Sequence, residues 1–222
     1  MIRLEKVSRT YVTGGGVTVL RNVSLHVKRG EAACIIGPSG SGKSTMLNIL
    51  GLLDRPSAGK FFFEGIDTAT LNDAALSHLR GRRIGFVFQS FHLIPHLSVV
   101  ENVELPLFYQ RVPPTERRRR AEEKLAQVRL SHRLHHRANQ LSGGECQRTA
   151  VARALITDAE LLLADEPTGN LDQKTGVEIL ALFDELQSTG KTLLVITHDM
   201  SVAARFQRRI HIADGLVSED AK

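Results

Sequence analysis

The fold is decided by the stretch Gly37-Pro38-Ser39-Gly40-Ser41-Gly42-Lys43-Ser44, which Thr45 follows. It fits the pattern G-x-x-x-x-G-K-[ST], in which glycines let successive backbone N–H groups turn inward around phosphates. In this pattern Lys43 reaches the β- and γ-phosphates, and the hydroxyl of Ser44 ligates Mg²⁺. The pattern also requires a strand before the loop and a helix after it, and the apolar run Ala32–Ile36 supplies the strand. The stretch therefore predicts a phosphate-binding loop between a buried strand and a helix.

Apolar runs and helical segments alternate along the chain. The runs Ala32–Ile36, Leu161–Ala164 and Thr192–Ile196 are continuously apolar, which is typical of strands buried on both faces of a parallel sheet. The positions of the apolar residues predict helices at 43–53, 115–130, 143–157 and 172–188. Strand, helix, strand, helix is the order of an α/β fold.

The two ends of the chain differ from this pattern. Residues 2–8 and 17–28 alternate apolar and polar, as half-buried strands do, with a turn at Gly14-Gly15-Gly16 between them. Residues 209–217 read as a hairpin that turns at Asp214-Gly215. Residues from about 88 to 157 are helix-rich between strand-rich flanks. We expect one α/β domain over residues 1–222: a P-loop NTPase core with a mostly parallel sheet, an N-terminal antiparallel β subdomain and an inserted α-helical subdomain at about 88–157.

The composition narrows the functional class. Of 222 residues, 42% are hydrophobic and 24% charged, which suits a globular protein with a real core and excludes a disordered or collagen-like chain. No apolar stretch approaches the roughly 20 residues of a membrane span, and Met1–Lys6 lacks the apolar centre of a signal peptide. Cys34 and Cys146 are too few for a disulfide framework and are not spaced as a metal site. A cytosolic, reduced protein is the default expectation.

The net charge of +5, from 29 basic and 24 acidic residues, permits two interpretations. Arginine clusters such as Arg117–Arg120 suggest either nucleic acid or an anionic membrane surface. The other interpretation is a solvated helix face, since three pairs here fall at i,i+4 and the aromatic residues are not interleaved with the arginines. We favour the helix face, with a helix start at Pro114-Thr115 and no nucleic acid as a partner. The expected pairs are Glu116/Arg120, Arg118/Glu122 and Arg119/Glu123, and the expected buried stripe is Ala121, Leu125 and Val128.

A pair of acids ends the apolar run at 161–164. Asp165 follows this run at the place where P-loop proteins hold Mg²⁺, and Glu166 is one residue further, in position to polarise an attacking water. Acids at strand ends are common on protein surfaces, so this pair is informative only because the phosphate-binding loop precedes it.

The stretch Leu141-Ser142-Gly143-Gly144-Glu145 stands at the start of the helix expected at 143–157. A helix start presents free N–H groups and a positive dipole end, so Ser142, Gly143 and Gly144 are suited to bind a phosphate. The chain's own loop already surrounds its nucleotide, so this patch makes chemical sense if it completes the site of a second subunit. With this stretch, the chain resembles the ATP-binding cassette (ABC) ATPases, and its matching motifs extend from Tyr11 to His198.

The resemblance implies further roles. Gln89 is similar to the glutamine that meets Mg²⁺ or the attacking water and senses the transport partner, and Asp172 to the aspartate that crosses the dimer interface. His198 is similar to the switch histidine that contacts the γ-phosphate and orders Glu166, and Tyr11 to the aromatic residue that stacks on adenine. The implied cofactors are ATP and Mg²⁺, with Glu166, His198 and Gln89 as catalytic residues and Ser44, Gln89 and Asp165 as metal ligands.

Two departures from the common family pattern refine the resemblance. Cys146 is an unusual residue after Glu145, and the stretch Gly169-Asn170-Leu171-Asp172 replaces the widespread Ser-Ala-Leu-Asp. Together with the stretches 47–54, 88–95 and 102–107, the second departure is similar to the bacterial lipoprotein-release and macrolide-export group, the MacB/LolD type. In that group the cassette drives membrane subunits that have few spans and a large periplasmic domain.

Two functions remain open. The first is the ATP-hydrolysing subunit of an ABC-type membrane transporter or mechanotransmission complex, working as a head-to-tail dimer with a separate transmembrane permease, on the cytoplasmic face of the inner membrane. The alternative is a soluble ABC ATPase that acts on nucleic acid or ribosomes. The short interval between Lys43 and Ser142 leaves no room for the long coiled coil of chromosome-acting types, and the single cassette differs from ribosome-acting types. We therefore favour the first.

Two hypotheses concern single surfaces. The apolar residues after Gln89 include Phe91 and Leu97, and we expect part of this set to line a groove for the membrane subunit. Pro95 and Pro106 predict that this segment is not one continuous helix.

Cys146 lies on the first turn of its helix, where an exposed thiol would have a lowered pKa, so a bulky thiol reagent there is expected to block dimer closure. The simpler alternative is an inert Cys146 that faces the subdomain core.

Overall fold

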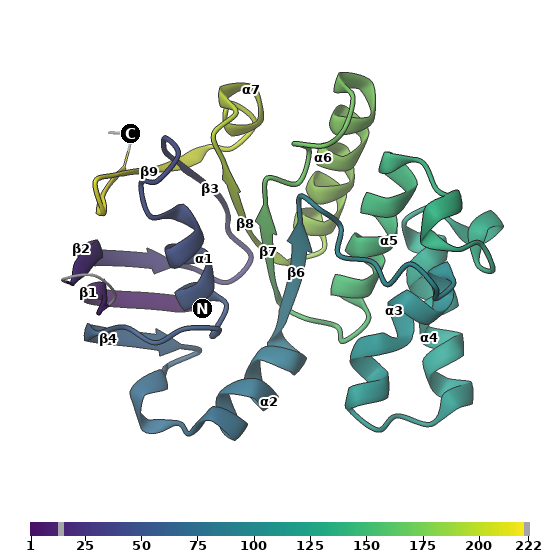
Figure 1. Ribbon diagram of the computed structural model, residues 1–222, viewed down its shortest axis with the longest axis horizontal. Helices are drawn as coiled ribbons and strands as arrows, with labels where there is room; N and C mark the ends of the chain where they lie inside the picture. The colour runs from purple at the N-terminus through teal and green to yellow at the C-terminus, as the bar shows by residue number, and fades with distance from the viewer. Residues whose placement is uncertain (13–15, 220–222) are drawn as a thin grey trace. The chain divides into compact units, whose positions relative to one another are not determined.

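The computed structural model describes residues 1–12 and 16–219, in two compact units (Figure 1). The first unit comprises Met1–Arg80 and Gly190–Lys222, and the second comprises Gly81–Thr189. The chain leaves the first unit and returns to it, so the second unit is an insertion in sequence. Each unit carries its own part of the candidate site.

An antiparallel sheet forms one layer of the first unit. Its strand order is β2 (Val17–Val27), β1 (Ile2–Tyr11), β4 (Ala58–Phe63) and β5 (Ile66–Asp67), and the first three run side by side in Figure 1. The alternating pattern is realised, since Ile2 and Leu4 are buried while Arg3 and Glu5 are exposed. The predicted N-terminal strands are confirmed. The turn predicted at 14–16 falls largely on residues 13–15, outside the described residues.

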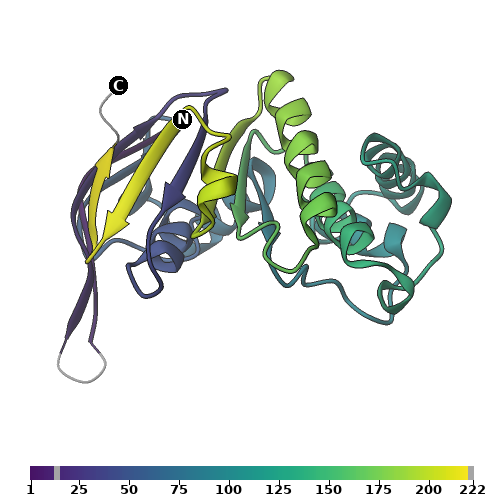
Figure 2. The same cartoon turned by 90° about the horizontal axis from the view of Figure 1, so that it is seen from above.

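The other strands of the first unit lie in the order β10 (Leu216–Glu219), β9 (Arg208–Ala213), β3 (Ala32–Ile36) and β8 (Thr192–Thr197). Strand β3 pairs in parallel with β8 and β9, whereas β9 and β10 form the predicted antiparallel hairpin. Helix α1 (Lys43–Leu50) follows β3, and the short helix α7 (Met200–Ala203) follows β8, as Figure 2 shows. The parallel pairing places the ends of β3 and β8 together, because Ile36 is in register with Thr197.

The second unit combines two parallel strands with a group of helices. Strands β6 (Ile84–Phe88) and β7 (Leu161–Asp165) pair in register, with Phe88 opposite Asp165. Helices α3 (Val99–Tyr109), α4 (Pro114–Gln127) and α5 (Gly143–Leu155) pack against one another, and α6 (Gln173–Ser188) packs against α5. Helix α2 (Asp73–Arg83) leads from the first unit into the second. Short 3₁₀ turns span Ser131–Arg133 and Ala138–Gln140 in this unit, and Thr68–Thr70 in the first.

These observations confirm the α/β class with a mostly parallel sheet and an antiparallel N-terminal part. The segments α2, β4, β6 and α3 were not among the predicted elements. The expectation that the segment after Gln89 is not one continuous helix is confirmed, because α3 begins only at Val99, although Pro106 lies inside the helix. Helix α3 tolerates Pro106 because Val100, Val103 and other residues bury its inner face against α4 and α5.

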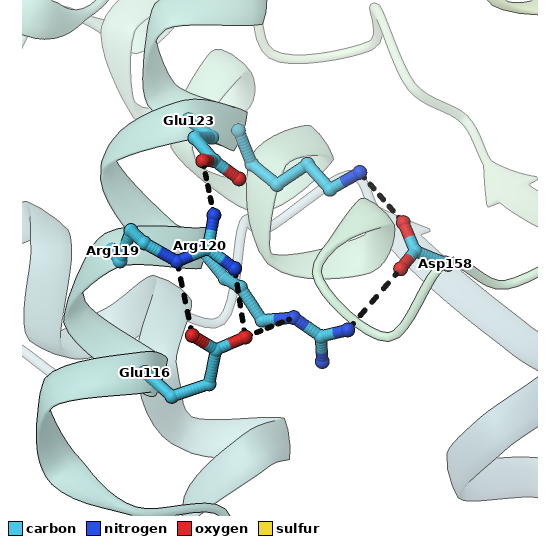
Figure 3. Close-up of polar contacts among 6 residues, drawn as sticks. Glu116, Arg119, Arg120, Glu123 and Asp158 are labelled. Carbon is cyan, nitrogen blue, oxygen red and sulfur yellow. Dashed lines mark hydrogen bonds and ion pairs between the residues drawn. The ribbon is translucent and has the colours of Figure 1, made fainter.

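The arginine-rich helix α4 is a solvated face bound by ion pairs (Figure 3). Arg119 contacts Glu116 at 2.8 Å and Glu123 at 2.5 Å, and Arg120 contacts Glu116 at 3.2 Å. The predicted pair of Arg118 with Glu122 is wrong, since Arg118 contacts Glu104 of α3 at 2.7 Å instead. The helix begins at Pro114 as expected, and the predicted stripe of Ala121, Leu125 and Val128 is fully buried.

Candidate nucleotide-binding site

The phosphate-binding loop connects β3 to α1 in the first unit. Gly40 and Gly42 have φ of 78° and 108°, which only glycine adopts without strain, and Gly42 caps α1. Lys43 Nζ donates to the carbonyl oxygens of Gly37 at 2.8 Å and Pro38 at 2.7 Å, so the lysine lies across the mouth of its own loop. Ser41 is 5% exposed, and its Oγ has no hydrogen-bond partner in the described part of the chain. A buried donor without a partner in a glycine-rich loop suits a phosphate ligand.

The hairpin β9–β10 supports this loop from a distant part of the sequence. A Cβ on Gly37 would lie 2.2 Å from the carbonyl oxygen of Ile212, so no larger residue fits there. Gly215 donates its backbone N–H to the carbonyl of Ser41 at 3.3 Å. The loop can be recognised from residues 37–44 alone. Its supporting residues Ile212 and Gly215 lie outside that motif and were not predicted.

His198 lies next to the same loop within the first unit. It directly follows β8, whose last residue Thr197 is in register with Ile36, the residue before Gly37. The side chain of His198 is exposed. The next residue, Asp199, caps α7, and hydrogen bonds from Ser201, followed by the charge of His198, lower the pKa of its carboxyl group. His198, the predicted switch histidine, is therefore adjacent to the phosphate-binding loop.

Tyr11 is fixed at the end of β1. Its hydroxyl donates to Asp54 Oδ2 at 2.9 Å, and Arg9 pairs with Asp54 Oδ1 at 2.8 Å. The guanidinium of Arg9 also lies over the tyrosine ring, 4.5 Å from its centroid. Arg9 thus covers one face of the ring, and adenine stacking, which stays a prediction, would use the other face.

Gln89 and Asp165 come together in the second unit. They lie at the ends of paired strands, since Phe88 is opposite Asp165. Glu166 follows with φ of 44°, an uncommon backbone conformation for a residue with a side chain. Positive φ in non-glycine residues is often found where a functional side chain is aimed in a required direction.

Asn170 joins the segment of Gln89 to the turn after Glu166. Gln89 Nε2 donates to Asn170 Oδ1 at 3.3 Å, and Asn170 Nδ2 donates to the Gln89 carbonyl at 3.0 Å. A Cβ on Gly169 would lie 2.6 Å from Gln89 Nε2, so the glycine permits this approach. Asn170 stands where the common family pattern has alanine, and it is therefore this departure that provides the contact with Gln89.

The segment 142–145 begins helix α5 in the second unit. Ser142 is the N-cap, and its Oγ accepts from the Glu145 N–H at 3.3 Å while Glu145 Oε2 accepts from the Ser142 N–H at 2.8 Å. The Ser142 hydroxyl also shares a side-chain hydrogen bond with the Glu145 carboxylate, so a phosphate oxygen competes with Glu145 for its one proton.

The start of α5 packs against the segment that leads into α6. A Cβ on Gly144 would lie 2.4 Å from Thr175 Cγ2, and a Cβ on Gly143 would lie 3.3 Å from Leu171. Asp172 caps α6, and its carboxylate accepts from the Thr175 N–H at 3.0 Å and from the Thr175 hydroxyl at 2.6 Å. Those bonds lower the pKa of Asp172. Gln89, Asn170, Asp172 and the residues 142–144 thus belong to one neighbourhood, which we call the signature cluster.

Two further residues of α5 hold this cluster and were not predicted. Gln147 is fully buried and donates to the carbonyl of Pro167 at 2.6 Å. Arg153 donates to the carbonyls of Phe91 at 2.7 Å and His92 at 2.5 Å, two consecutive residues with φ of 58° and 48°. Burial lowers the pKa of Arg153. The sequence carries no clear signal for either residue, because their partners Pro167, Phe91 and His92 lie in other segments.

The structure overturns the hypothesis of a reactive Cys146. The residue is 9% exposed, and its thiol faces the carbonyl of Ala138 at 3.7 Å. Burial, and then the charge of Glu145, raise the pKa of this thiol. The helix dipole lowers a thiol pKa only where the sulfur meets solvent, so here desolvation prevails.

The donor set fits the expected nucleotide and metal. Backbone N–H groups of a glycine loop suit phosphates, and the hydroxyl, carboxylate and amide of Ser44, Asp165 and Gln89 are oxygen donors of the kind that Mg²⁺ prefers. Among residues 1–12 and 16–219, no three His, Cys, Asp or Glu side chains gather as a transition-metal site would require. The roles of these residues stay predictions.

The comparisons with known proteins agree with this geometry. The model of the family described as ABC transporter matches residues 20–169. A macrolide export ATP-binding/permease protein, MacB of Bartonella henselae, is 49% identical over 98% of this chain and 33% of its own length. An uncharacterized ABC transporter ATP-binding protein of Thermotoga maritima is 55% identical over 90% of this chain and 86% of its own. The chain thus spans about a third of the length of the macrolide-export relative.

A solved structure resembles the whole chain. The ATP-binding cassette MJ0796, in a dimeric post-hydrolysis state bound to ADP and Pi, has a TM-score of 0.90 and 47% identity over 99% of this chain and 98% of its own. No helix in the described ranges is long and apolar enough to span a membrane. With the family match over most of its length, the chain belongs to the ABC transporter family, as a nucleotide-binding, ATP-hydrolysing cassette of the MacB-like type.

Proposed function

We propose that the chain powers an ABC-type membrane complex of the MacB/LolD type by hydrolysing ATP as a head-to-tail dimer. One observation carries the proposal: the chain builds two helix N-termini suited to phosphate, at Gly42 before α1 and at Ser142 before α5, in two different units. One of them is the chain's own phosphate-binding loop. The other is suited to close the site of a second copy, and the dimeric state of the solved relative supports this arrangement.

The reaction follows from the residues around these two helix starts. In ATP + H₂O → ADP + phosphate, Glu166 polarises the attacking water and His198 orients it against the γ-phosphate. Lys43 exchanges its two carbonyl bonds for phosphate oxygens, and the N–H groups at 142–144 of the second copy bind the same phosphate. Ser44, Gln89 and Asp165 would hold Mg²⁺, which would neutralise charge on the phosphates when bound. Residues 88–157 act as the helical subdomain that carries the signature, within a RecA-like core.

The decisive experiment separates binding from hydrolysis. Replacing Glu166 with Gln should lower turnover by about 10²–10⁴-fold, because the general base is lost, while ATP binding is retained. An ATP-dependent dimer should then accumulate in light scattering after size-exclusion chromatography. Adding Gly144→Asp to this variant should abolish the dimer. Glu185→Gln is the matched control, since its carboxylate pairs on the surface with Arg129. Near wild-type hydrolysis by Glu166→Gln would refute the assignment.

The membrane partner is proposed to dock between α3 and α4. A groove of about 800 Å³ there is lined by the apolar residues Leu97, Leu105 and Phe108 together with charged side chains such as Arg119 and Glu122. Phe108 is 56% exposed, so the groove offers apolar surface to a partner. A lining that is both apolar and charged suits an amphipathic helix, here a cytoplasmic helix of the permease. The ion pairs of Arg118, Arg119 and Arg120 also leave little free basic charge on α4 for nucleic acid.

The structure sharpens the test of this surface. A charge at Phe91 would disturb the signature cluster as well, because a Cβ on Gly143 would lie 3.9 Å from the Phe91 ring. Leu97→Glu is the cleaner variant: the isolated subunit should hydrolyse ATP, but its co-purification with the permease should be lost. Leu216→Glu changes an equally apolar, 57% exposed residue of β10 and serves as the control. Normal co-purification and coupling by Leu97→Glu would place the docking surface elsewhere.

A further inference from the structure

The carboxylate of Glu145 is shared between the start of α5 and an arginine outside the helix. Its Oε2 accepts from the Ser142 N–H at 2.8 Å, and its Oε1 accepts from Arg133 Nε at 2.7 Å. Arg133 also contacts His136 Nε2 at 3.0 Å through its NH1 group. The one other titratable group near the carboxylate among the described ion pairs is His132, at 3.8 Å and largely exposed. Glu145 is therefore held from two sides, and one side carries a full positive charge.

The position of Glu145 creates an electrostatic conflict for a phosphate-binding helix start. A carboxylate in the first turn uses the positive end of the helix, which is the same feature that attracts a phosphate. It would also repel the charge of an incoming nucleotide. Glu145 is mostly screened from water, with a side chain that is 19% exposed, so solvent reduces that repulsion less than it would at an open surface.

Arg133 resolves this conflict by its charge and by its geometry. Burial alone would raise the pKa of Glu145, but the bonds from Ser142 and Arg133 together lower it, so the carboxylate is ionised and needs a counter-charge. The guanidinium holds Oε1, which leaves Oε2 directed at the Ser142 backbone. The capping box then fixes Ser142 at the start of α5, with both its backbone N–H and its side chain bonded to Glu145.

We propose that Arg133 is a positioning residue for the signature: it neutralises Glu145 and holds it on Ser142, so that the start of α5 can receive the γ-phosphate of a second copy. The proposal rests on the function proposed above. Arg133 itself contacts no nucleotide in this scheme, and it acts through Glu145.

The test is a double-mutant cycle of R133Q and E145Q in the full chain, read as kcat and KM for ATP. Gln at a capping-box position can still accept from the N-cap N–H, so E145Q removes the charge and keeps the geometry. R133Q should lower kcat/KM about tenfold when Glu145 is present, mainly through KM. In the E145Q background, R133Q should change kcat/KM less than twofold. An arginine that only stabilises the fold would give the same loss in both backgrounds, which would overturn the proposal.

Two further variants keep the test interpretable. R133K retains the charge without the guanidinium fork and should recover more than half of the loss, even if R133Q lowers the melting temperature. The defect of R133Q should also shrink at high salt, because screening weakens the unbalanced repulsion. R129Q is the control for a lost surface ion pair, since Arg129 contacts Glu185 at 2.8 Å away from the signature. An R133K as impaired as R133Q, or a defect that salt does not change, would contradict a role through charge.

Failure of this inference can be told from failure of the proposed function. If the start of α5 does not serve hydrolysis, S142A and G144D will hydrolyse ATP at the wild-type rate. If those two variants are inactive while R133Q is not impaired, the function stands and the role of Arg133 falls.

Discussion

The phosphate-binding loop and the signature cluster both present a helix N-terminus, but the chain holds them by different means. The loop is built from glycines and from Lys43, which bonds to carbonyls five and six residues before it. The signature cluster depends on side chains from remote segments, such as Gln89 and Asn170, which are 81 residues apart. The remote support of the loop comes from the backbone of Ile212 and Gly215, whereas the cluster depends on remote side chains that shift when any one segment moves. This difference fits the roles proposed above, in which the loop binds ATP and the cluster responds to a partner.

The largest effect is expected at the loop. Lys43→Ala removes both carbonyl bonds and the charge that the phosphates need, so nucleotide affinity should fall by about 100-fold or more. Titration with a fluorescent ATP analogue measures this loss. Lys60→Ala, at an exposed residue of β4, should bind as the wild type does. Binding by Lys43→Ala within threefold of wild type would show that the loop does not depend on its lysine.

A smaller effect is expected where the cluster meets α6. Gly144→Ala would place a Cβ 2.4 Å from Thr175 Cγ2, so the start of α5 must shift and ATPase activity should fall about tenfold. Gly143→Ala meets Leu171 only at 3.3 Å and should cost less. Thr175→Ser removes Cγ2 and keeps the hydroxyl that bonds to Asp172, so it should restore most of the activity of Gly144→Ala. Steady-state hydrolysis of the single and double variants tests this, and no rescue would contradict the steric explanation.

A still smaller effect is expected at Asn170. Asn170→Ala removes both bonds to Gln89, so basal hydrolysis should change only about threefold while stimulation by the permease is largely lost. Hydrolysis measured with and without the membrane partner in lipid discs separates the two quantities. Equal stimulation of wild type and variant would show that the Gln89–Asn170 contact carries no coupling.

The smallest effect is expected at Cys146. Because this thiol is buried with a raised pKa, a disulfide reagent should label it in the folded Cys34→Ser protein at least tenfold more slowly than after unfolding in urea. Cys146→Ala should change hydrolysis less than twofold. Rapid labelling of the folded protein would mean that the start of α5 opens often.

Local patterns were sufficient for much of this molecule. The glycines and Lys43 specify their loop within eight residues, and continuous apolar runs identify β3, β7 and β8 because such strands are buried on both faces. Helix α5 was predicted because its apolar periodicity lies within one segment, and its capping box is equally local.

Long-range support was not predictable in the same way. Helix α3 contains Pro106, and only its packing against α4 and α5 makes a helix there favourable. The pairing of Arg118 with Glu104 instead of Glu122 depends on how α3 lies against α4. The burial of Cys146 and the bonds of Arg153 also require the tertiary structure, since the same residues in an isolated helix would face water.

The turn at Phe91 and His92 has a thermodynamic consequence. Two consecutive left-handed residues cost about 1–2 kcal/mol each, and two hydrogen bonds from the Arg153 guanidinium return about 1.5–3 kcal/mol each. The bonds therefore offset the strain, and the guanidinium makes this backbone conformation favourable. Without Arg153 the two strained residues would lack that compensation, and the segment after Gln89 would relax towards ordinary backbone angles. One side chain of α5 thus determines the backbone of a segment about sixty residues earlier in the chain.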